Sequence, residues 1–224
     1  MIEVGRRSSK EASGNARGDR ARATIADALI ALVDEGNLRP TAGEIATRAG
    51  VSERSLYFHF GDAEGLFRAA AERRLSAIAA SFVPIDVSLP FLQRVAGFVR
   101  QRAGLLEIIT PMRRAALLQE STSPAIAEGL SRVRAFKAEQ ARAVFAAELG
   151  RLAPKEREVA GAAVATAASW SAWESLRNHQ GLDGARASAV MRALLVGALG
   201  QSIAEEAARP AGRTAARRST ARGR

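Results

Sequence analysis

Apolar residues recur every three or four positions along most of this chain, a spacing typical of amphipathic helices. No segment alternates apolar and polar residues between turn signals, as a half-buried strand would. The pattern therefore predicts an all-α fold. The first helix is expected at residues 22–35, with Ile25, Leu29 and Leu32 on its buried stripe and Gly36 as its C-terminal stop.

Two short helices joined by a turn are predicted next. Thr41 is expected to cap the first of them, and Glu44, three residues further on, completes a capping box. Gly50 ends this helix, and Ser52 caps the second one over residues 53–60. This spacing is that of a helix-turn-helix, in which the second helix enters the major groove of DNA.

The rest of the chain predicts a larger helical domain. Gly61 ends the third helix, and Asp62 caps a fourth one that ends before Pro84. The later helices are expected at residues 90–103, 105–119 with an interruption at Pro111, 124–149, 154–180 and 184–208.

The composition excludes several classes of function. The chain has 224 residues, no cysteine and two histidines, so disulfides and cysteine-based metal sites are excluded and other metal sites are not expected. No nucleophile, metal-ligand or nucleotide-phosphate motif is present, and we expect neither an enzyme nor a cofactor. No apolar run reaches the ~18–20 residues of a membrane span, and the N-terminus lacks a signal-peptide core, so a cytoplasmic protein is expected.

The net charge of +10 is concentrated in the two ends of the chain. Residues 1–24 carry +3 and residues 207–224 carry +6, whereas residues 25–74, which include the helix-turn-helix, carry −2. Affinity for DNA depends largely on neutralised phosphates, so we expect the N-terminal arm to supply cations from Arg20 and Arg22, together with Arg17. A merely solubilising arm is the alternative.

The third predicted helix offers side chains suited to DNA. Glu53, Arg54 and Ser55 project at its N-terminal tip, where arginine can pair with guanine, serine with bases or phosphate, and glutamate with cytosine. Tyr57 and His59 follow and are long enough to reach the backbone. The alternative is that both are ordinary surface residues of a bundle helix.

Three segments of this region, ATIADALIALVDEGN, PTAGEIATRAGVS and SLYFHFGDAEGLF, resemble the N-terminal domain of the TetR family of bacterial transcriptional regulators. The resemblance covers about residues 22–74. It implies phosphate contacts by Thr41, Tyr57 and His59, and base contacts by Arg54 and Ser55 with Glu53 beside them. The chain departs from the family in having Ala63 where lysine is frequent after the fourth helix's cap, and Asn37 and Leu38 where an aromatic residue often follows the glycine.

The composition of the two ends and the resemblance together predict the organisation of the whole chain. We expect a flexible basic arm at residues 1–21, a helix-turn-helix DNA-binding domain at 22–82, a helical effector-binding and dimerisation domain at 83–208, and a disordered Arg-rich tail at 209–224. The implied function is that of a homodimeric, sequence-specific regulator, a repressor of a pseudo-palindromic operator in double-stranded DNA, controlled by a small-molecule effector. The alternative is an all-helical protein-interaction protein with a degenerate helix-turn-helix. The net charge of −2 over residues 25–74 and the presence of Ala63 favour this alternative.

The last two predicted helices carry small residues at close helical spacing, which permits the close helix approach of a tight dimer interface. They are Gly161, Ala165, Ala168 and Ala172 in one helix and Ala189, Ala193, Gly197 and Gly200 in the other. Packing within one chain is the alternative. No ligand-binding residue is assigned, because Glu107, Arg113, Arg114 and Glu120 fit a solvated face, and Met112, Phe136, Phe145, Trp170 and Trp173 fit a core, as well as a pocket.

Overall fold

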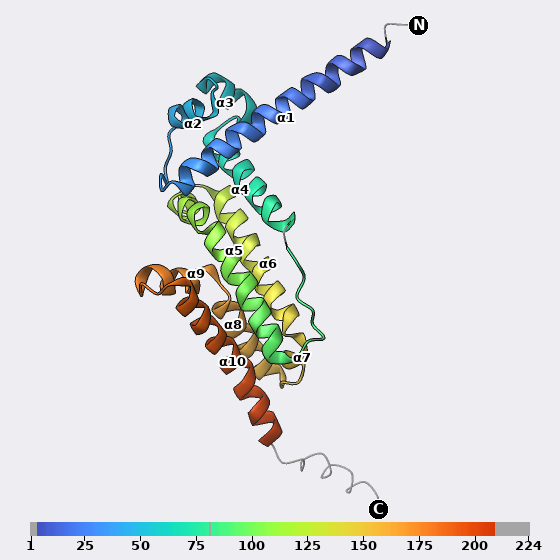
Figure 1. The fold of residues 1–224 in the computed structure, drawn as a ribbon, viewed down its shortest axis with the longest axis vertical. Helices are drawn as coiled ribbons and strands as arrows, with labels where there is room; N and C mark the ends of the chain where they lie inside the picture. The colour runs from blue at the N-terminus through green and yellow to red at the C-terminus, as the bar shows by residue number, and fades with distance from the viewer. Residues whose placement is uncertain (1–3, 81, 209–224) are drawn as a thin grey trace, which may run out of the picture. The chain divides into compact units, whose positions relative to one another are not determined.

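The structure, a computed structural model, describes residues 4–80 and 82–208, with side chains over residues 16–80 and 82–200. Within these residues every regular element is a helix, which confirms the predicted all-α fold (Figure 1). The helices are α1 (Val4–Asp34), α2 (Ala42–Ala49), α3 (Glu53–Phe60), α4 (Ala63–Ala80), α5 (Phe91–Glu120), α6 (Pro124–Val144), α7 (Ala146–Gly150), α8 (Pro154–Ala167), α9 (Trp170–Glu174), a π-helical turn (Ser175–His179) and α10 (Gly184–Ala208). The tail predicted at residues 209–224 lies outside the described residues.

The chain folds as two compact units, and α5 and α6 run through both of them. The first unit comprises Met1–Pro84 and Gly104–Arg134, and the second comprises Ile85–Ala103 and Ala135–Arg224. The predicted domains at residues 22–82 and 83–208 were defined by function and stay a prediction.

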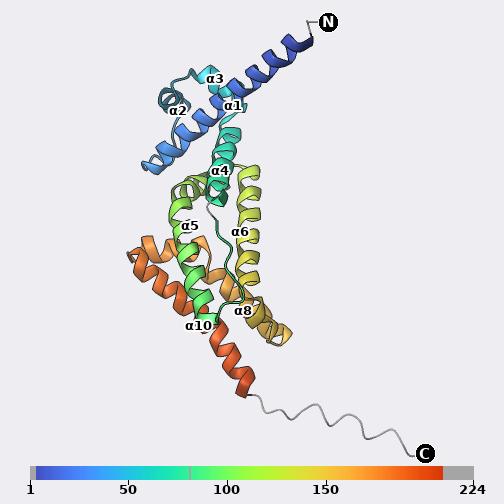
Figure 2. The same ribbon diagram turned by 45° about the vertical axis from the view of Figure 1, so that its right-hand side comes forward.

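The core of the first unit joins the helix-turn-helix to parts of α5 and α6. Helices α2 and α3 pack against each other and against α1, and α4 packs against α1 and α3 (Figures 1 and 2). The buried residues of this core are Ile25, Leu29, Leu32 and Val33 from α1, Ile45 from α2, Leu56 from α3, Leu66, Phe67 and Ala70 from α4, Met112, Ala115 and Ala116 from α5, and Ile126 from α6. The predicted stripe of the first helix is therefore confirmed.

Helix α1 begins at Val4 and not at residue 22, so the expectation of a flexible arm over residues 1–21 is wrong for Val4 onwards. The segment contains alanine, arginine, lysine and glutamate, which favour helix, and no proline. The packed part of α1 supplies the helical nucleus, after which each added residue extends an existing helix at low cost.

Helix α5 is continuous where two helices were expected. It passes through Gly104 and Pro111 without ending, although an interior proline costs about 3 kcal/mol or more. Leu106 before the proline and Met112 after it are both buried, so packing on either side outweighs this cost. The Thr110 hydroxyl donates to the Leu106 carbonyl at 2.6 Å, one turn earlier.

Two other predicted helices are divided in the structure. The helix expected at residues 124–149 ends at Val144, and α7 follows after Phe145. The helix expected at residues 154–180 ends at Ala167 because Ser169 caps a new helix, its hydroxyl accepting from the Ala172 amide at 3.1 Å. The last helix begins at Gly184 and ends at Ala208, as predicted.

In the second unit α8 and α10 lie side by side (Figure 2). Phe145 and Trp173 are fully buried in this unit, which confirms them as core residues, whereas Phe136 is exposed. An ion pair between Arg94 and Glu148 is also buried: the two side chains are 5% and 4% exposed. Arg94 additionally donates to two backbone carbonyls of the same unit.

Candidate nucleic-acid interface

The cap of α2 fixes the entry into the helix-turn-helix. The Thr41 amide donates to Glu44 Oε2 at 2.7 Å and the Glu44 amide donates to Thr41 Oγ1 at 3.3 Å, so the predicted capping box is present. The pKa of the Glu44 carboxyl is lowered, first by the hydrogen bond from the Thr41 backbone and then by those from the side chains of Thr41 and Asn37. The Thr41 hydroxyl is thus part of the cap, and its phosphate contact stays a prediction.

The turn between α2 and α3 is set by one glycine and one serine. Gly50 has φ +68°, in the left-handed region that favours glycine, and its amide donates to the Ala46 and Thr47 carbonyls. Ser52 then caps α3, because its hydroxyl accepts from the Ser55 amide at 3.2 Å. Both helix ends lie where the sequence predicts them.

Helix α3 presents one face to the core and the other to solvent. Leu56 is buried and Phe60 packs against the same core. Glu53 and Arg54 are exposed, Ser55 is half-buried, and Tyr57 is 45% exposed. His59 is half-buried. The structure therefore brings these predicted DNA-contacting side chains together on one short helix, with the reading tip accessible.

Phe58 is an exposed residue of this helix that the sequence analysis missed. Its side chain is 84% exposed, and its ring meets the His59 ring edge-on at a centroid distance of 5.4 Å. Helical spacing could have predicted this exposure. Phe58 lies two residues from both Leu56 and Phe60, so its side chain points away from the core that these two residues share. An exposed apolar ring on this face can contact a thymine methyl group.

The Glu53 carboxylate lies against α2. A Cβ added to Gly43 would come within 3.1 Å of Glu53 Oε1, so only a residue without a side chain leaves room at this position without displacing the carboxylate. Glu53 is also in the first turn of α3, where a negative charge is stabilised by the helix dipole. The base contact of Glu53 stays a prediction.

The two arginines expected to contact DNA from the arm differ in their surroundings. The Arg22 guanidinium donates to the His59 carbonyl at the end of α3 and lies 4.6 Å from the centroid of the Phe60 ring. Arg20 donates to the Ala16 carbonyl within α1, at 3.2 Å. Arg22 therefore braces α3 against α1, and both arginines are exposed.

Three arginines of the helix-turn-helix region are bound to carboxylates near α1. Arg48 pairs with Glu35 at 2.7 Å. Arg73 pairs with Asp27, and Arg74 pairs with Asp34. These ion pairs join α2 and α4 to the first helix and take up cationic charge, which leaves the exposed Arg54 as the cation at the tip of α3.

Neither a metal-ligand cluster nor a membrane-spanning helix is found in the described part of the chain. There is no group of three or more histidine, aspartate or glutamate side chains that could hold a metal ion among these residues. None of their helices is long and apolar enough to cross a membrane.

Comparisons with known proteins agree with this geometry. Residues 25–70 match the model of the family described as bacterial regulatory proteins, tetR family. A TetR-like transcriptional regulator from Rhodococcus sp. RHA1 shares the fold with a TM-score of 0.54 and 16% identity, over 80% of this chain and 96% of that one. A protein assigned to the TetR family from Mesorhizobium loti MAFF303099 gives 0.52 and 17%, over 84% of this chain and 98% of that one. No curated protein matches the sequence.

Proposed function

Because residues 25–70 match the model of the tetR family of bacterial regulatory proteins, we propose that this chain is a sequence-specific DNA-binding transcriptional regulator of that family whose α3 reads the major groove. The observation that carries this proposal is the capped turn between α2 and α3. It holds the N-terminus of α3 exposed and leaves its polar face free of core contacts.

The side chains divide into those that specify the sequence and those that position the protein. In this proposal Arg54 and Ser55, with Glu53 beside them, contact base edges. The phosphate contacts come from Thr41, Tyr57 and His59 in the helix-turn-helix, and from Arg20 and Arg22 in α1. Residues 25–74 carry a net charge of −2, so in this proposal the arginines of α1 contribute much of the affinity for DNA.

The proposed regulator acts as a homodimer through α8 and α10. Val159 on α8 is 70% exposed and Leu194 on α10 is 50% exposed, so both of these adjoining helices offer apolar surface to a partner. Ala189 and Ala193 of the small-residue stripe are also exposed, whereas Gly161 and Ala168 are buried within the unit. A two-fold dimer then reads a pseudo-palindromic operator with half-sites one or more helical turns apart.

The proposed direction of regulation is repression, with a small-molecule effector that changes the affinity for the operator. Such an effector must bind the DNA-free and DNA-bound states with different affinity.

The test is a titration of the full chain with its own upstream DNA, followed by fluorescence anisotropy at several salt concentrations. Arg54→Ala should weaken specific binding by about 5- to 150-fold, because a bidentate contact to a base is worth about 1–3 kcal/mol. Tyr57→Phe should weaken specific and random DNA alike. Arg100→Ala, a matched change at an exposed arginine of α5, should have no effect. Light scattering should show a dimer at micromolar concentration.

The second candidate is a protein-interaction protein whose helix-turn-helix no longer binds DNA. The net charge of −2 over residues 25–74 and the presence of Ala63 favour it. The same titration decides between the two, since the absence of a specific complex at every salt concentration would support the interaction protein and refute the regulator.

A further inference from the structure

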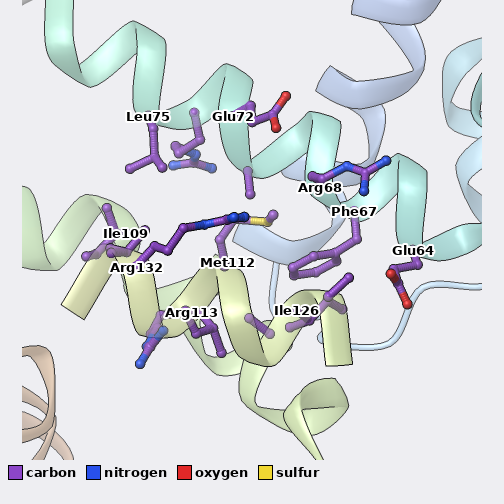
Figure 3. Close-up of a pocket in the computed structure, with 17 residues that line it drawn as sticks. Glu64, Phe67, Arg68, Glu72, Leu75, Ile109, Met112, Arg113, Ile126 and Arg132 are labelled. Carbon is purple, nitrogen blue, oxygen red and sulfur yellow. The ribbon is translucent and has the colours of Figure 1, made fainter. Parts of the chain in front are cut away.

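A cavity of about 270 Å³ lies in the first unit, between α4, α5 and α6 (Figure 3). Its inner wall is apolar and is formed chiefly by Phe67, Met112, Ile126 and Leu130. The first three are nine-tenths or more buried and belong to the core of the unit. The cavity is therefore a recess in the core that also holds the helix-turn-helix in place.

The volume limits the size of a ligand. A cavity of about 150 Å³ lined by aliphatic and aromatic side chains is large enough for benzene. The present cavity is not quite twice that size and lies just below the common range for ligand pockets of roughly 300–1,000 Å³. It fits one six-membered ring with a short substituent, or an acyl chain of similar length.

The rim of the cavity carries more positive than negative charge. Four arginines and two glutamates line it, and two of the arginines pair with carboxylates outside this lining, Arg74 with Asp34 and Arg132 with Glu128. Of the carboxylates, Glu64 accepts a hydrogen bond from the Ser123 hydroxyl at 2.6 Å, and Glu72 points away from α5 and α6 (Figure 3). The rim thus favours an anionic group on the ligand.

Arg132 is the rim cation best placed to receive that group. In Figure 3 its side chain extends from α6 into the space toward α4. It pairs with Glu128 at 3.0 Å, and both side chains are about 70% exposed, at 71% and 67%. An exposed pair one helical turn apart is worth only about 0.3–0.5 kcal/mol, so a ligand carboxylate can replace Glu128 at small cost.

Two further arginines add to the positive potential. Arg68 lies exposed on α4 at the rim. Burial lowers the pKa of the half-buried Arg113 guanidinium, and the charge of Arg134 lowers it further, while Glu120 opposes the shift. A nearby anion would stabilise this desolvated cation.

We propose that this cavity binds a small amphipathic organic anion, a carboxylate on a single ring or short acyl chain. Its apolar body lies against Phe67 and Met112, and its carboxylate binds Arg132 at the rim.

Binding in this cavity is coupled to the helix-turn-helix through α4. Phe67 belongs both to the cavity wall and to the core that includes Leu56 of α3. Arg74 lines the cavity and also pairs with Asp34 of α1. A ligand that changes the packing of α4 therefore changes the support of α3, and this regulatory step rests on the proposed function.

The site itself is tested without DNA, by calorimetric titration of the full chain with phenylacetate and its neutral isostere phenylacetamide. Phenylacetate should bind more tightly than the amide. Arg132→Gln should weaken phenylacetate by about fivefold and Glu128→Gln should strengthen it, because the second change removes the competing carboxylate. Neither should alter phenylacetamide binding, and Arg100→Gln should alter nothing. No binding of phenylacetate at millimolar concentration, or equal effects on acid and amide, would overturn the proposal.

A cavity-filling variant checks the location. Ala71→Leu places three further carbon atoms in the cavity from α4 and should abolish binding of both compounds, while the far-ultraviolet circular dichroism spectrum stays that of the wild type. Unchanged binding in a folded Ala71→Leu chain would place the ligand elsewhere and refute the assignment.

The regulatory step is tested by repeating the anisotropy titration with phenylacetate present. Operator affinity should fall for the wild type and stay constant for Ala71→Leu, and DNA should weaken phenylacetate binding by the same factor, as linkage requires. An unaffected operator affinity would refute the coupling. If the chain binds no operator at all, the proposed function fails while the calorimetric result for the cavity still stands.

Discussion

The buried ion pair of the second unit provides the sharpest test of how this fold is stabilised. Arg94 Nη1 lies 3.0 Å from Glu148 Oε2, and Nη2 makes a second contact with the same carboxylate. Arg94 also donates to the Leu89 carbonyl at 2.9 Å and to the Val144 carbonyl at 2.8 Å. Both charges are thus removed from water and fully hydrogen-bonded to one another or to backbone.

Removing the cation alone should be strongly destabilising. Arg94→Met leaves the Glu148 carboxylate buried without its counter-charge, which costs about 3–5 kcal/mol. The double variant Arg94→Met, Glu148→Leu removes both charges and leaves two carbonyls that lose a donor, at about 1–3 kcal/mol each as an upper bound. The single variant deprives the same two carbonyls of their donor, so the two variants differ in the unpaired buried carboxylate, and we expect the double variant to be more stable by at least ~1 kcal/mol.

The assay is equilibrium urea unfolding followed by circular dichroism, with the slope of the transition checked for constancy. Arg186→Met is the matched control, because Arg186 and Asp183 are 3.8 Å apart and 76% and 63% exposed, and its effect should stay within about 0.5 kcal/mol. The reasoning is refuted if Arg94→Met behaves like the control, or if the double variant loses as much stability as the two single variants together.

Three further predictions concern the helix-turn-helix. Gly50→Ala should lower the free energy of unfolding by about 1–2 kcal/mol because φ there is +68°, whereas Gly104→Ala inside α5 should raise it by about 0.5–1 kcal/mol, both measured by urea unfolding. Ser52→Ala should cost about 1 kcal/mol and weaken operator binding, since the cap orients α3; equal affinity in anisotropy titrations would disprove this. The pKa of Glu44 is lowered below 4.5 by the Thr41 amide, so its contribution is present above that pH and disappears as the pH falls through the lowered pKa. Thermal melts from pH 7 to 3 should show this loss in the wild type and a smaller one in Glu44→Gln.

The parts of the fold that sequence could predict are those fixed by local chemistry. Thr41, Gly50 and Ser52 each satisfy backbone groups within a few residues, so the ends of α2 and α3 follow from residue type alone. The continuation of α5 through Pro111 could not be predicted in this way. It depends on the burial of residues on both sides of the proline, against partners that are distant in sequence.

In the candidate nucleic-acid interface, too, local spacing predicts some features and contacts between distant residues determine the others. The exposure of Tyr57 and the burial of Leu56 follow from helical spacing, and Phe58 could have been found by the same argument. The contact between Arg22 and the end of α3 could not, because it joins residues 37 positions apart. The cavity beside Phe67 likewise exists only where three helices meet.

The continuity of α1 gives the arginines before the helix-turn-helix a fixed angular phase. Each residue of an α-helix turns the chain by about 100°, so Arg17 and Arg20 share one side of the rod while Arg22 points to another. One extra alanine between Arg20 and Arg22 would swing the first two arginines by about 100° without changing any charge. Seven extra residues would restore their direction and displace them by about 10 Å along the axis. If α1 contacts DNA as a helix, the affinity for DNA must rise and fall periodically with the length of such insertions. If the segment were a flexible arm, the affinity would change smoothly with the length.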